Sequence, residues 1–290
     1  MTSHAPATAA QPVTPALRQW IIEQAQAGFS AAVILQSMQD AGWDGVVAAD
    51  ALETTLQQHL QVQAEQPKPP SEQRTPEPLM AQSPAYLDGG DRQVGVLVAL
   101  AQPRVVVLGG LLSDDECDAL IADAAPRMAR SLTVASQTGG EEINDDRTSD
   151  GMFFQRGETA LIARIEQRIA RLLNWPMEFG EGLQVLHYRP GAEYKPHYDY
   201  FDPAEAGTPS LLQRGGQRVG TVVMYLNTPT LGGGTTFPDV QLTVAAQRGN
   251  AVFFSYEQPS PNTRTLHGGA PVLAGDKWIA TKWLRAQEFK

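Results

Sequence analysis

The chain has 290 residues, a net charge of −10 and a hydrophobic content of 42%, which is ordinary for a globular protein. The acidic balance argues against a general affinity for nucleic acid, because phosphate binding depends on clustered lysine and arginine. The single cysteine, Cys117, excludes an intrachain disulfide and any zinc site built on two cysteines. Its apolar, periodic surroundings predict a small core residue.

Neither a membrane span nor a secretion signal is expected from the sequence. The chain contains no run of eighteen apolar residues, and its N-terminus has no basic start followed by an apolar stretch. We therefore expect no contact with a membrane and a cytoplasmic location.

The first 85 residues predict a small helical module and a linker. Residues 1–14 are rich in alanine, threonine and proline, which is typical of a disordered segment. Apolar residues at helical spacing predict short helices over 15–64, which can bury Trp20 and Trp43 in a small core. We interpret this module as structural or as a docking unit for a partner. Residues 65–85 are proline-rich and predict an extended linker.

Residues 86–290 predict a mainly β domain with flanking helices. The segment Ser113-Asp-Asp-Glu116 forms a capping box that opens a helix to about Arg130, and a second helix is predicted over 158–173. Many short strands with glycine and proline turns, behind two helices, favour a double-stranded β-helix, or jelly roll, with a site in its mouth. The predicted strands are 93–101, 104–108, 183–189, 193–200, 217–227, 234–237, 241–244, 250–255, 263–267 and 276–285.

Three side chains in this domain are candidate metal ligands. His197 and Asp199 lie two residues apart in a predicted strand, so their side chains point to the same face. His267, near the end of another predicted strand, can supply a third ligand. Two histidines and one carboxylate form the facial triad of non-haem iron(II) oxygenases, which leaves three positions on the ion open. The His-x-Asp pair alone is weak evidence, because many such groups are structural.

Lys277 provides a second indication, which carries weight only together with the triad. Lys277, Ile279, Thr281 and Trp283 share one face of the predicted last strand, and their apolar character indicates that this face points inward. A buried lysine without a partner is costly, so a ligand carboxylate is a natural partner. In the alternative interpretation, Lys277 reaches solvent past Trp278 with its stem packed on apolar surface.

Beyond these single residues, an ordered series of segments resembles the catalytic domain of prolyl 4-hydroxylases, which are dioxygenases dependent on 2-oxoglutarate and Fe(II). The likeness runs from about residue 94 to 286 and is strongest from residue 183. The matching segments are LQVLHY (183–188), YKPHYDYF (194–201), GGQR (215–218), MYLN (224–227), GGGTTFP (232–238), GNAVFF (249–254) and the stretch 266–283.

The resemblance implies a role for each candidate residue in metal and cosubstrate binding. His197, Asp199 and His267 match the iron ligands, which are also the catalytic centre. Lys277 is similar to the residue that pairs with the far carboxylate of 2-oxoglutarate. The positions of Tyr188 and Thr235 match residues that hydrogen-bond the same carboxylate. Tyr188 could instead be a half-buried strand aromatic, and Thr235 could simply favour its strand.

The resemblance also implies contacts with a substrate. Tyr194, Arg218 and Trp283 match positions near the substrate peptide, although Arg218 could instead pair with a surface carboxylate. The polar segment 136–151 resembles the mobile substrate loop of the family. His187 alternates to the face opposite Tyr188, and we interpret it as structural.

The implied activity is hydroxylation of peptidyl proline with Fe(II), 2-oxoglutarate and O₂, releasing succinate and CO₂, with ascorbate as a candidate reductant. The expected partner is a proline-containing protein or peptide. Two alternatives stay open: the same chemistry on another residue or a small molecule, or a catalytically silent binding module. The absence of disulfides makes collagen a doubtful substrate.

Overall fold

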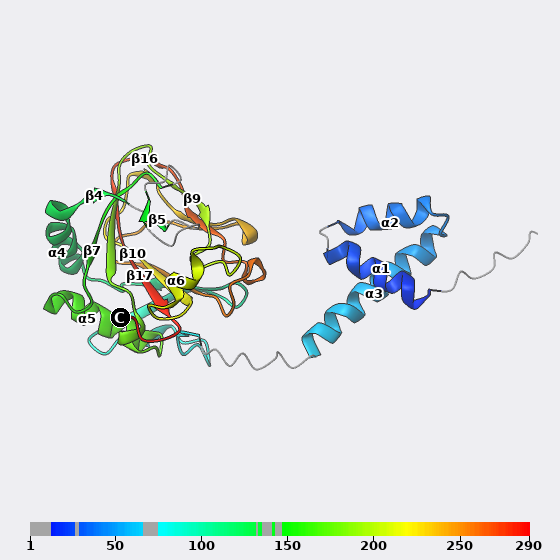
Figure 1. Ribbon diagram of the computed structural model, residues 1–290, viewed down its shortest axis with the longest axis horizontal. Helices are drawn as coiled ribbons and strands as arrows, with labels where there is room; N and C mark the ends of the chain where they lie inside the picture. The colour runs from blue at the N-terminus through cyan, green and yellow to red at the C-terminus, as the bar shows by residue number, and fades with distance from the viewer. Residues whose placement is uncertain (1–12, 27–28, 66–74, 132, 135–140, 143–146) are drawn as a thin grey trace, which may run out of the picture. The chain divides into compact units, whose positions relative to one another are not determined.

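The computed structural model describes residues 13–26, 29–65, 75–131, 133–134, 141–142 and 147–290 (Figure 1). The chain divides into two compact units, Met1–Ser71 and Glu72–Lys290. Most of the segment 1–14 that is expected to be disordered lies outside the described residues. Among the residues that are described, no helix is long and apolar enough to span a bilayer.

The N-terminal unit is a three-helix module, as the periodicity predicts. Its helices are α1 (Pro15–Gln26), α2 (Ala31–Asp40) and α3 (Gly45–Glu65). The Ser30 hydroxyl accepts a hydrogen bond from the Val33 amide at the start of α2. Trp20 and Trp43 are partly buried against the core of this unit. That core consists of Ile21, Ile34, Met38, Ala48, Ala51 and Leu52.

The larger unit is built on a nine-stranded sheet and a four-stranded sheet, both antiparallel in all their pairs. In spatial order the large sheet contains β1 (Tyr86–Asp88), β2 (Gln93–Leu100), β3 (Arg104–Gly109), β14 (Ala251–Ser255), β10 (Arg218–Tyr225), β17 (Lys277–Arg285), β8 (Leu183–Tyr188), β7 (Asp150–Phe154) and β4 (Ala129–Arg130). The small sheet contains β13 (Leu242–Val244), β12 (Thr235–Phe237), β15 (His267–Gly269) and β9 (Tyr194–His197). Two further pairs are β11 (Leu231–Gly232) with β16 (Val272–Ala274), and β5 (Thr133–Val134) with β6 (Glu141–Glu142).

One apolar core lies between the two sheets. Val223 and Phe254 of the large sheet belong to the same buried cluster as Phe237 and Val244 of the small sheet. Side chains that alternate along the strands of the large sheet therefore supply one face to this core and the other face to the helices. This arrangement confirms the predicted mainly β fold of the jelly-roll class, preceded by a small all-α module.

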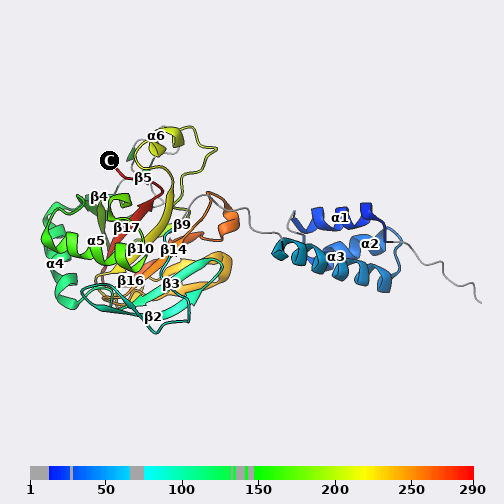
Figure 2. The same cartoon turned by 90° about the horizontal axis from the view of Figure 1, so that it is seen from below.

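Two helices cover the outer face of the large sheet. Figures 1 and 2 show α4 (Asp114–Ala124) and α5 (Ala160–Leu172) on the side of that sheet away from β9. The predicted capping box is present, since the Ser113 hydroxyl accepts from the Glu116 amide and the Glu116 carboxylate accepts from the Ser113 amide. Cys117 is buried in the core beneath α4, which confirms its interpretation as a core residue.

Several boundaries and strands differ from the sequence prediction. The first helix ends at Ala124 rather than near Arg130, because Pro126 lies in the following 3₁₀ turn. The predicted strand 263–267 is wrong in its first part. Arg264 there has the left-handed φ of 55° after a 3₁₀ turn, so the strand begins only at His267. The strands β7 and β16 were not predicted.

The C-terminal part of the predicted linker packs on the larger unit. Pro76 is buried, and the Glu77 amide donates a hydrogen bond to the Leu173 carbonyl. The predicted linker is therefore too long at this end. Its segment 66–74 lies outside the described residues.

Candidate active site

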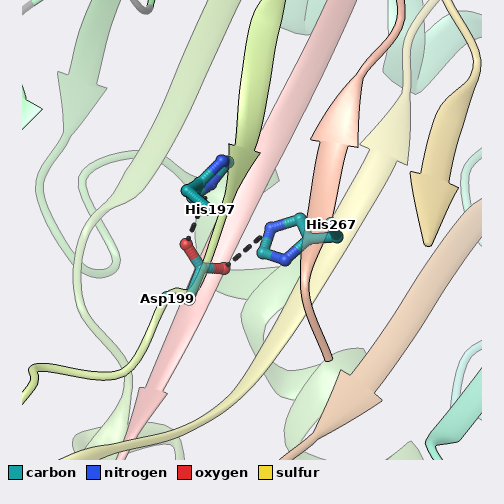
Figure 3. Close-up of side chains that lie close together, drawn as sticks. All are labelled: His197, Asp199 and His267. Carbon is teal, nitrogen blue, oxygen red and sulfur yellow. Dashed lines mark ion pairs between the residues drawn. The ribbon is translucent and has the colours of Figure 1, made fainter. Parts of the chain in front are cut away.

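The side chains of the three predicted metal ligands lie close together, with the Asp199 carboxylate between the two imidazoles (Figure 3). His197 ends β9, His267 begins β15, and the two residues are directly paired across the strands. Asp199 follows two residues after β9. Its carboxylate oxygens lie 3.5 Å from Nε2 of His197 and 3.5 Å from Nε2 of His267. One ligand atom from each residue lies within 4.8 Å of the other two, which suits a shared ion.

Both histidines are oriented by their own backbone. Nδ1 of His197 lies 2.8 Å from the Lys195 carbonyl, and Nδ1 of His267 lies 3.0 Å from the Thr265 carbonyl. Because a carbonyl only accepts, each Nδ1 carries the proton and each Nε2 has a free lone pair toward Asp199. Burial lowers the pKa of His267 to about 4, which keeps this imidazole neutral near pH 7. Two imidazoles and one carboxylate are a donor set that fits Fe(II).

Asp199 is held by a hydroxyl chain that the sequence did not reveal. Thr221 donates a hydrogen bond of 2.7 Å to Asp199 Oδ2, and the Thr221 hydroxyl also lies 3.1 Å from the Tyr256 hydroxyl. Burial alone would raise the pKa of Asp199, but His267, His197 and Arg218 together hold it below its ordinary value. The carboxylate is therefore ionised and fixed in one orientation, as a metal ligand requires.

Lys277 lies in the same cavity as the triad. Its side chain is only 2% exposed, and Nζ lies 5.1 Å from the centroid of the Tyr188 ring, which belongs to the directly paired residue of β8. Within the described part of the chain, Nζ forms no hydrogen bond and no ion pair, and burial lowers the pKa of Lys277 to about 8. This position excludes the alternative in which Lys277 reaches solvent past Trp278.

The groups predicted to bind 2-oxoglutarate surround Lys277. Tyr188 and Thr235 are buried and line the cavity with the lysine and the triad. The hydroxyl of Tyr225, which was not predicted, donates a 2.8 Å hydrogen bond to Thr235 Oγ1 and fixes its orientation. Gly269 also lines this cavity. One buried cation and two or more hydroxyl groups can thus receive a carboxylate.

Two of the three predicted substrate contacts line the cavity. The Tyr194 ring stacks on His197 with 3.7 Å between ring centroids, and the Arg147 guanidinium lies 5.0 Å over the Tyr194 ring. Burial raises the pKa of Tyr194 to about 12, so its hydroxyl stays protonated. Trp283 lines the side of the cavity formed by β17.

Arg218 has a different environment from the one predicted. Its guanidinium donates hydrogen bonds of 2.7 and 3.0 Å to the Glu181 carboxylate and lies 4.2 Å over the Trp283 ring. Among the described residues it is not part of the cavity lining. Its guanidinium lies against Trp283, which does line the cavity, and the position of Arg218 near the substrate peptide stays a prediction. The alternative prediction, that Arg218 pairs with a carboxylate, is confirmed in the pairing itself. Its partner Glu181, however, is buried and does not lie at the surface.

The predicted substrate loop is described only in part. Residues 135–140 and 143–146 lie outside the described part of the chain. Arg147, at the end of the loop, is buried and donates a 2.8 Å hydrogen bond to Gln184. His187 stacks on Trp278 with 4.2 Å between centroids, on the face away from the cavity. This contact agrees with its interpretation as structural.

Comparisons with known proteins agree with this geometry. The sequence profile of the 2OG-Fe(II) oxygenase superfamily matches residues 183–285, a span that holds the triad and Lys277. Prolyl 4-hydroxylase 5 of Arabidopsis thaliana is 40% identical over 222 residues, which cover 69% of this chain and 74% of the relative. Probable prolyl 4-hydroxylase 3 of the same plant is 40% identical over 210 residues, 65% of this chain and 71% of the relative. A solved viral collagen prolyl hydroxylase from Paramecium Bursaria Chlorella virus-1, in its 2OG complex, is 30% identical, covers 62% of this chain and 95% of its own, and has a TM-score of 0.49.

The jelly roll, the triad and the buried lysine define a 2-oxoglutarate- and Fe(II)-dependent oxygenase. Within that superfamily, the chain belongs to the prolyl 4-hydroxylase family. It is therefore a dioxygenase that uses Fe(II), 2-oxoglutarate and O₂.

Proposed function

We propose that this enzyme hydroxylates proline residues within a peptide or protein and converts 2-oxoglutarate to succinate and CO₂ in the same cycle. The observation that carries the proposal is one cavity that contains both the His197–Asp199–His267 triad and the buried ammonium of Lys277, which has no acidic partner among the described residues. The relatives named prolyl 4-hydroxylases support proline as the target.

Different residues of this cavity bind the cosubstrate and the metal. Lys277 binds the far carboxylate of 2-oxoglutarate, and Tyr188 and Thr235 orient it by hydrogen bonds. When bound, iron held by the triad supplies the activation of oxygen. Because Lys277 and the triad line one cavity, a diacid held by the lysine can present its keto acid end to the triad.

The substrate approaches over an aromatic part of the cavity. The Tyr194 ring stacks on His197, and the Trp283 ring of β17 lines the same cavity. Aromatic rings therefore border the position of the metal. Such rings pack well on a proline ring and exclude water from the reacting C–H bond. The enzyme thus supplies orientation and a dry site, with ascorbate as an added reductant in the reaction mixture.

Two further parts of the proposal concern the cellular location of the protein and the role of its N-terminal module. We propose a cytoplasmic protein, on the single cysteine, which excludes an intrachain disulfide. The three-helix module has its own core and exposes Phe29 and Val46, at 51% and 79%, which supports a role in docking a protein substrate. Removing residues 1–71 would then raise KM for a protein substrate and leave KM for a short peptide unchanged.

A mass measurement tests the proposed reaction. The purified protein is incubated with Fe(II), 2-oxoglutarate, ascorbate and proline-containing peptides, and a gain of about 16 daltons on proline is expected with equimolar succinate. Peptides with alanine in place of proline are the control. Oxygen found only on another residue or on a free metabolite would overturn proline as the target. A complete lack of succinate and of iron binding would favour a silent binding module.

A further inference from the structure

Two side-chain amides lie at the two ends of β10, the strand between β14 and β17. Gln217 directly precedes this strand, and Asn227 follows it by two residues. Each amide forms two hydrogen bonds with the backbone of another segment, and each of those segments carries a residue of the active site. Neither contact belongs to the strand pairing of the sheet, because β10 has ended at both positions.

Gln217 holds the backbone two residues beyond the carboxylate ligand. The Phe201 amide donates a hydrogen bond of 2.8 Å to Oε1 of Gln217, and Nε2 of Gln217 donates one of 2.7 Å to the Phe201 carbonyl. Oε1 also accepts a hydrogen bond from the Arg218 amide at 2.9 Å. Since a backbone N–H only donates and a carbonyl only accepts, these partners fix which end of the amide is the oxygen.

This contact is important because the segment that carries Asp199 has left the sheet. β9 ends at His197, and the chain bends at Asp199. Neither strand pairing nor, among the described residues, any other backbone–backbone hydrogen bond holds residues 198–201. The Asp199 backbone therefore lies between two supports, the pairing of β9 with β15 at His197 and the Gln217 amide at Phe201.

Asn227 holds the backbone on both sides of the cavity lysine. The Trp278 amide donates a hydrogen bond of 2.7 Å to Oδ1 of Asn227, and Nδ2 of Asn227 donates one of 2.8 Å to the Asp276 carbonyl. The strand pairing of β17 with β10 ends at Ile279. The amide thus takes the place of the next strand partner, and its two contacts flank Lys277 directly.

An amide suits both places for the same chemical reason. It carries an acceptor and a donor on one planar group, as a peptide unit does, so it can replace a missing strand partner. A carboxylate keeps only the acceptors, and an apolar side chain of the same size keeps neither. Because an unpaired backbone group is costly away from water, loss of the amide would let the segment move to find other partners.

We propose that Gln217 and Asn227 are positioning residues that replace missing strand partners at the two ends of β10. Gln217 fixes the segment of the metal ligand Asp199, and Asn227 fixes the segment of Lys277. One strand thereby holds both the metal-binding and the cosubstrate-binding segment. The part that concerns Gln217 rests on the triad alone, whereas the part that concerns Asn227 rests on the proposed binding of 2-oxoglutarate by Lys277.

Two variants and two binding measurements test this pair of roles. Gln217→Met and Asn227→Leu keep the approximate size of each side chain and remove both of its hydrogen bonds. Mn(II) is the probe ion in place of Fe(II), and the electron paramagnetic resonance signal of the free ion gives its affinity for the protein. 2-Oxoglutarate is then titrated by calorimetry into protein saturated with Mn(II). Neither measurement depends on a peptide substrate.

The expected losses fall on different ligands in the two variants. Gln217→Met lowers the affinity for Mn(II) about five- to fiftyfold and changes the affinity for 2-oxoglutarate by no more than about twofold. Asn227→Leu lowers the affinity for 2-oxoglutarate about five- to fiftyfold and changes the affinity for Mn(II) by no more than about twofold. Hydrogen exchange gives a local check: the Phe201 amide exchanges at least about tenfold faster only in the first variant, and the Trp278 amide only in the second.

A matched glutamine and two milder variants serve as controls. Gln213 is an exposed glutamine four residues before Gln217, and Gln213→Met leaves both affinities unchanged. If an apolar variant does not fold, Gln217→Glu and Asn227→Asp take its place, because each keeps an acceptor and loses the donor. Each should show the same selective loss in a weaker form.

The outcomes separate these roles from the proposed function. Equal losses of both affinities within either variant would overturn the proposal, since the effect is then on the fold as a whole. Affinities that stay within about twofold in both variants would overturn it as well. An unchanged affinity for 2-oxoglutarate in Lys277→Met removes the basis of the Asn227 part and leaves the Gln217 part standing. Failure of the enzyme to hydroxylate proline would contradict the proposed function and leave both binding results as they are.

Discussion

The ammonium of Lys277 lies 5.1 Å from the centre of the Tyr188 ring and, within the described residues, has no acidic partner. The two residues are directly paired on β17 and β8, so the backbone of the sheet fixes their approach. The ring face compensates only in part for the loss of water around the charge. The structure therefore holds a buried cation available to a carboxylate, and we expect Lys277 to affect both cosubstrate binding and stability.

Replacing this lysine weakens the binding of 2-oxoglutarate. Lys277→Met removes a charge-assisted hydrogen bond of about 1.5–3 kcal/mol, so KM for 2-oxoglutarate rises about ten- to a hundredfold. Because the pKa of Lys277 is about 8 in the free enzyme, affinity for 2-oxoglutarate falls in the unmodified enzyme between pH 7 and 9. The variant has no such fall. Titration of 2-oxoglutarate at several pH values measures both effects, and an unchanged KM would remove Lys277 from its assigned role.

The same substitution stabilises the protein in the absence of 2-oxoglutarate. Burial lowers the folded-state pKa of Lys277 from 10.5 to about 8, so folding is opposed by the charged lysine at all pH values below about 8. Lys277→Met relieves this cost and raises the free energy of unfolding by about 1–3 kcal/mol at pH 7. The gain declines as pH rises from 8 toward 10.5, where the lysine is neutral in the unfolded chain as well. Thermal unfolding without cosubstrate measures it, and a lower Tm for the variant would contradict this account.

The predictable part of the site depends on strand parity. His197 with Asp199, and Lys277 with Thr281 and Trp283, share faces because their spacing is even, and the structure brings these side chains to one cavity. The prediction for Asp199 rested on a strand that continues to residue 200, although β9 ends at His197. The chain bends at Asp199, and its carboxylate oxygens still lie 3.5 Å from Nε2 of each imidazole.

The unpredicted part depends on contacts between distant segments. Glu181 lies in a short connection before β8, and nothing in its neighbours indicates that it binds Arg218 and Arg285. Thr221 lies in an apolar strand whose faces are both buried, so no alternation marks it as the partner of Asp199. Such roles follow from the register of β10 and β17, which a single sequence does not determine.

Thr221 is expected to support metal binding through Asp199. Thr221→Val keeps the shape of the side chain and removes the 2.7 Å hydrogen bond to Asp199 Oδ2. Loss of such a contact to a metal ligand ordinarily reduces metal affinity about ten- to a hundredfold. The iron concentration that gives half-maximal succinate release measures the change. Thr221→Ser retains the hydroxyl and should bind iron as the unmodified enzyme does; equal iron affinity in the valine variant would refute this role.

His267 and His187 form a matched pair for testing the metal centre. His267→Ala removes one of three ligands, so succinate release should fall by at least about a thousandfold, with loss of iron binding. His187→Ala removes an imidazole of the same domain that faces away from the cavity and stacks on Trp278. This variant should keep its turnover within about twofold. Comparable losses in both variants would mean that the effect is on folding rather than on the metal.

Glu181 is expected to be the most sensitive ionised group of the fold outside the cavity. Its carboxylate is buried and accepts hydrogen bonds from Arg218 at 2.7 Å and from Arg285 at 2.9 Å. Glu181→Ala leaves two mostly buried guanidinium groups without their counter-charge, so the free energy of unfolding should fall by about 3–5 kcal/mol.

The pH dependence of stability shows whether Glu181→Ala destabilises the protein through lost charge or through lost packing. Burial would raise the pKa of Glu181, but Arg218 and Arg285 hold it below its ordinary value of 4.5. The stability that Glu181 contributes is thus present above pH 4.5 and is lost as pH falls through the lower folded-state pKa. The difference in Tm between Glu181→Ala and the unmodified enzyme should therefore be largest near pH 7 and narrow in acid. Glu288→Gln, at an exposed pair with Lys290 at 3.3 Å, should change the free energy of unfolding by less than about 0.5 kcal/mol. A Glu181→Ala difference that does not vary with pH would show that lost packing, rather than lost charge, destabilises the variant.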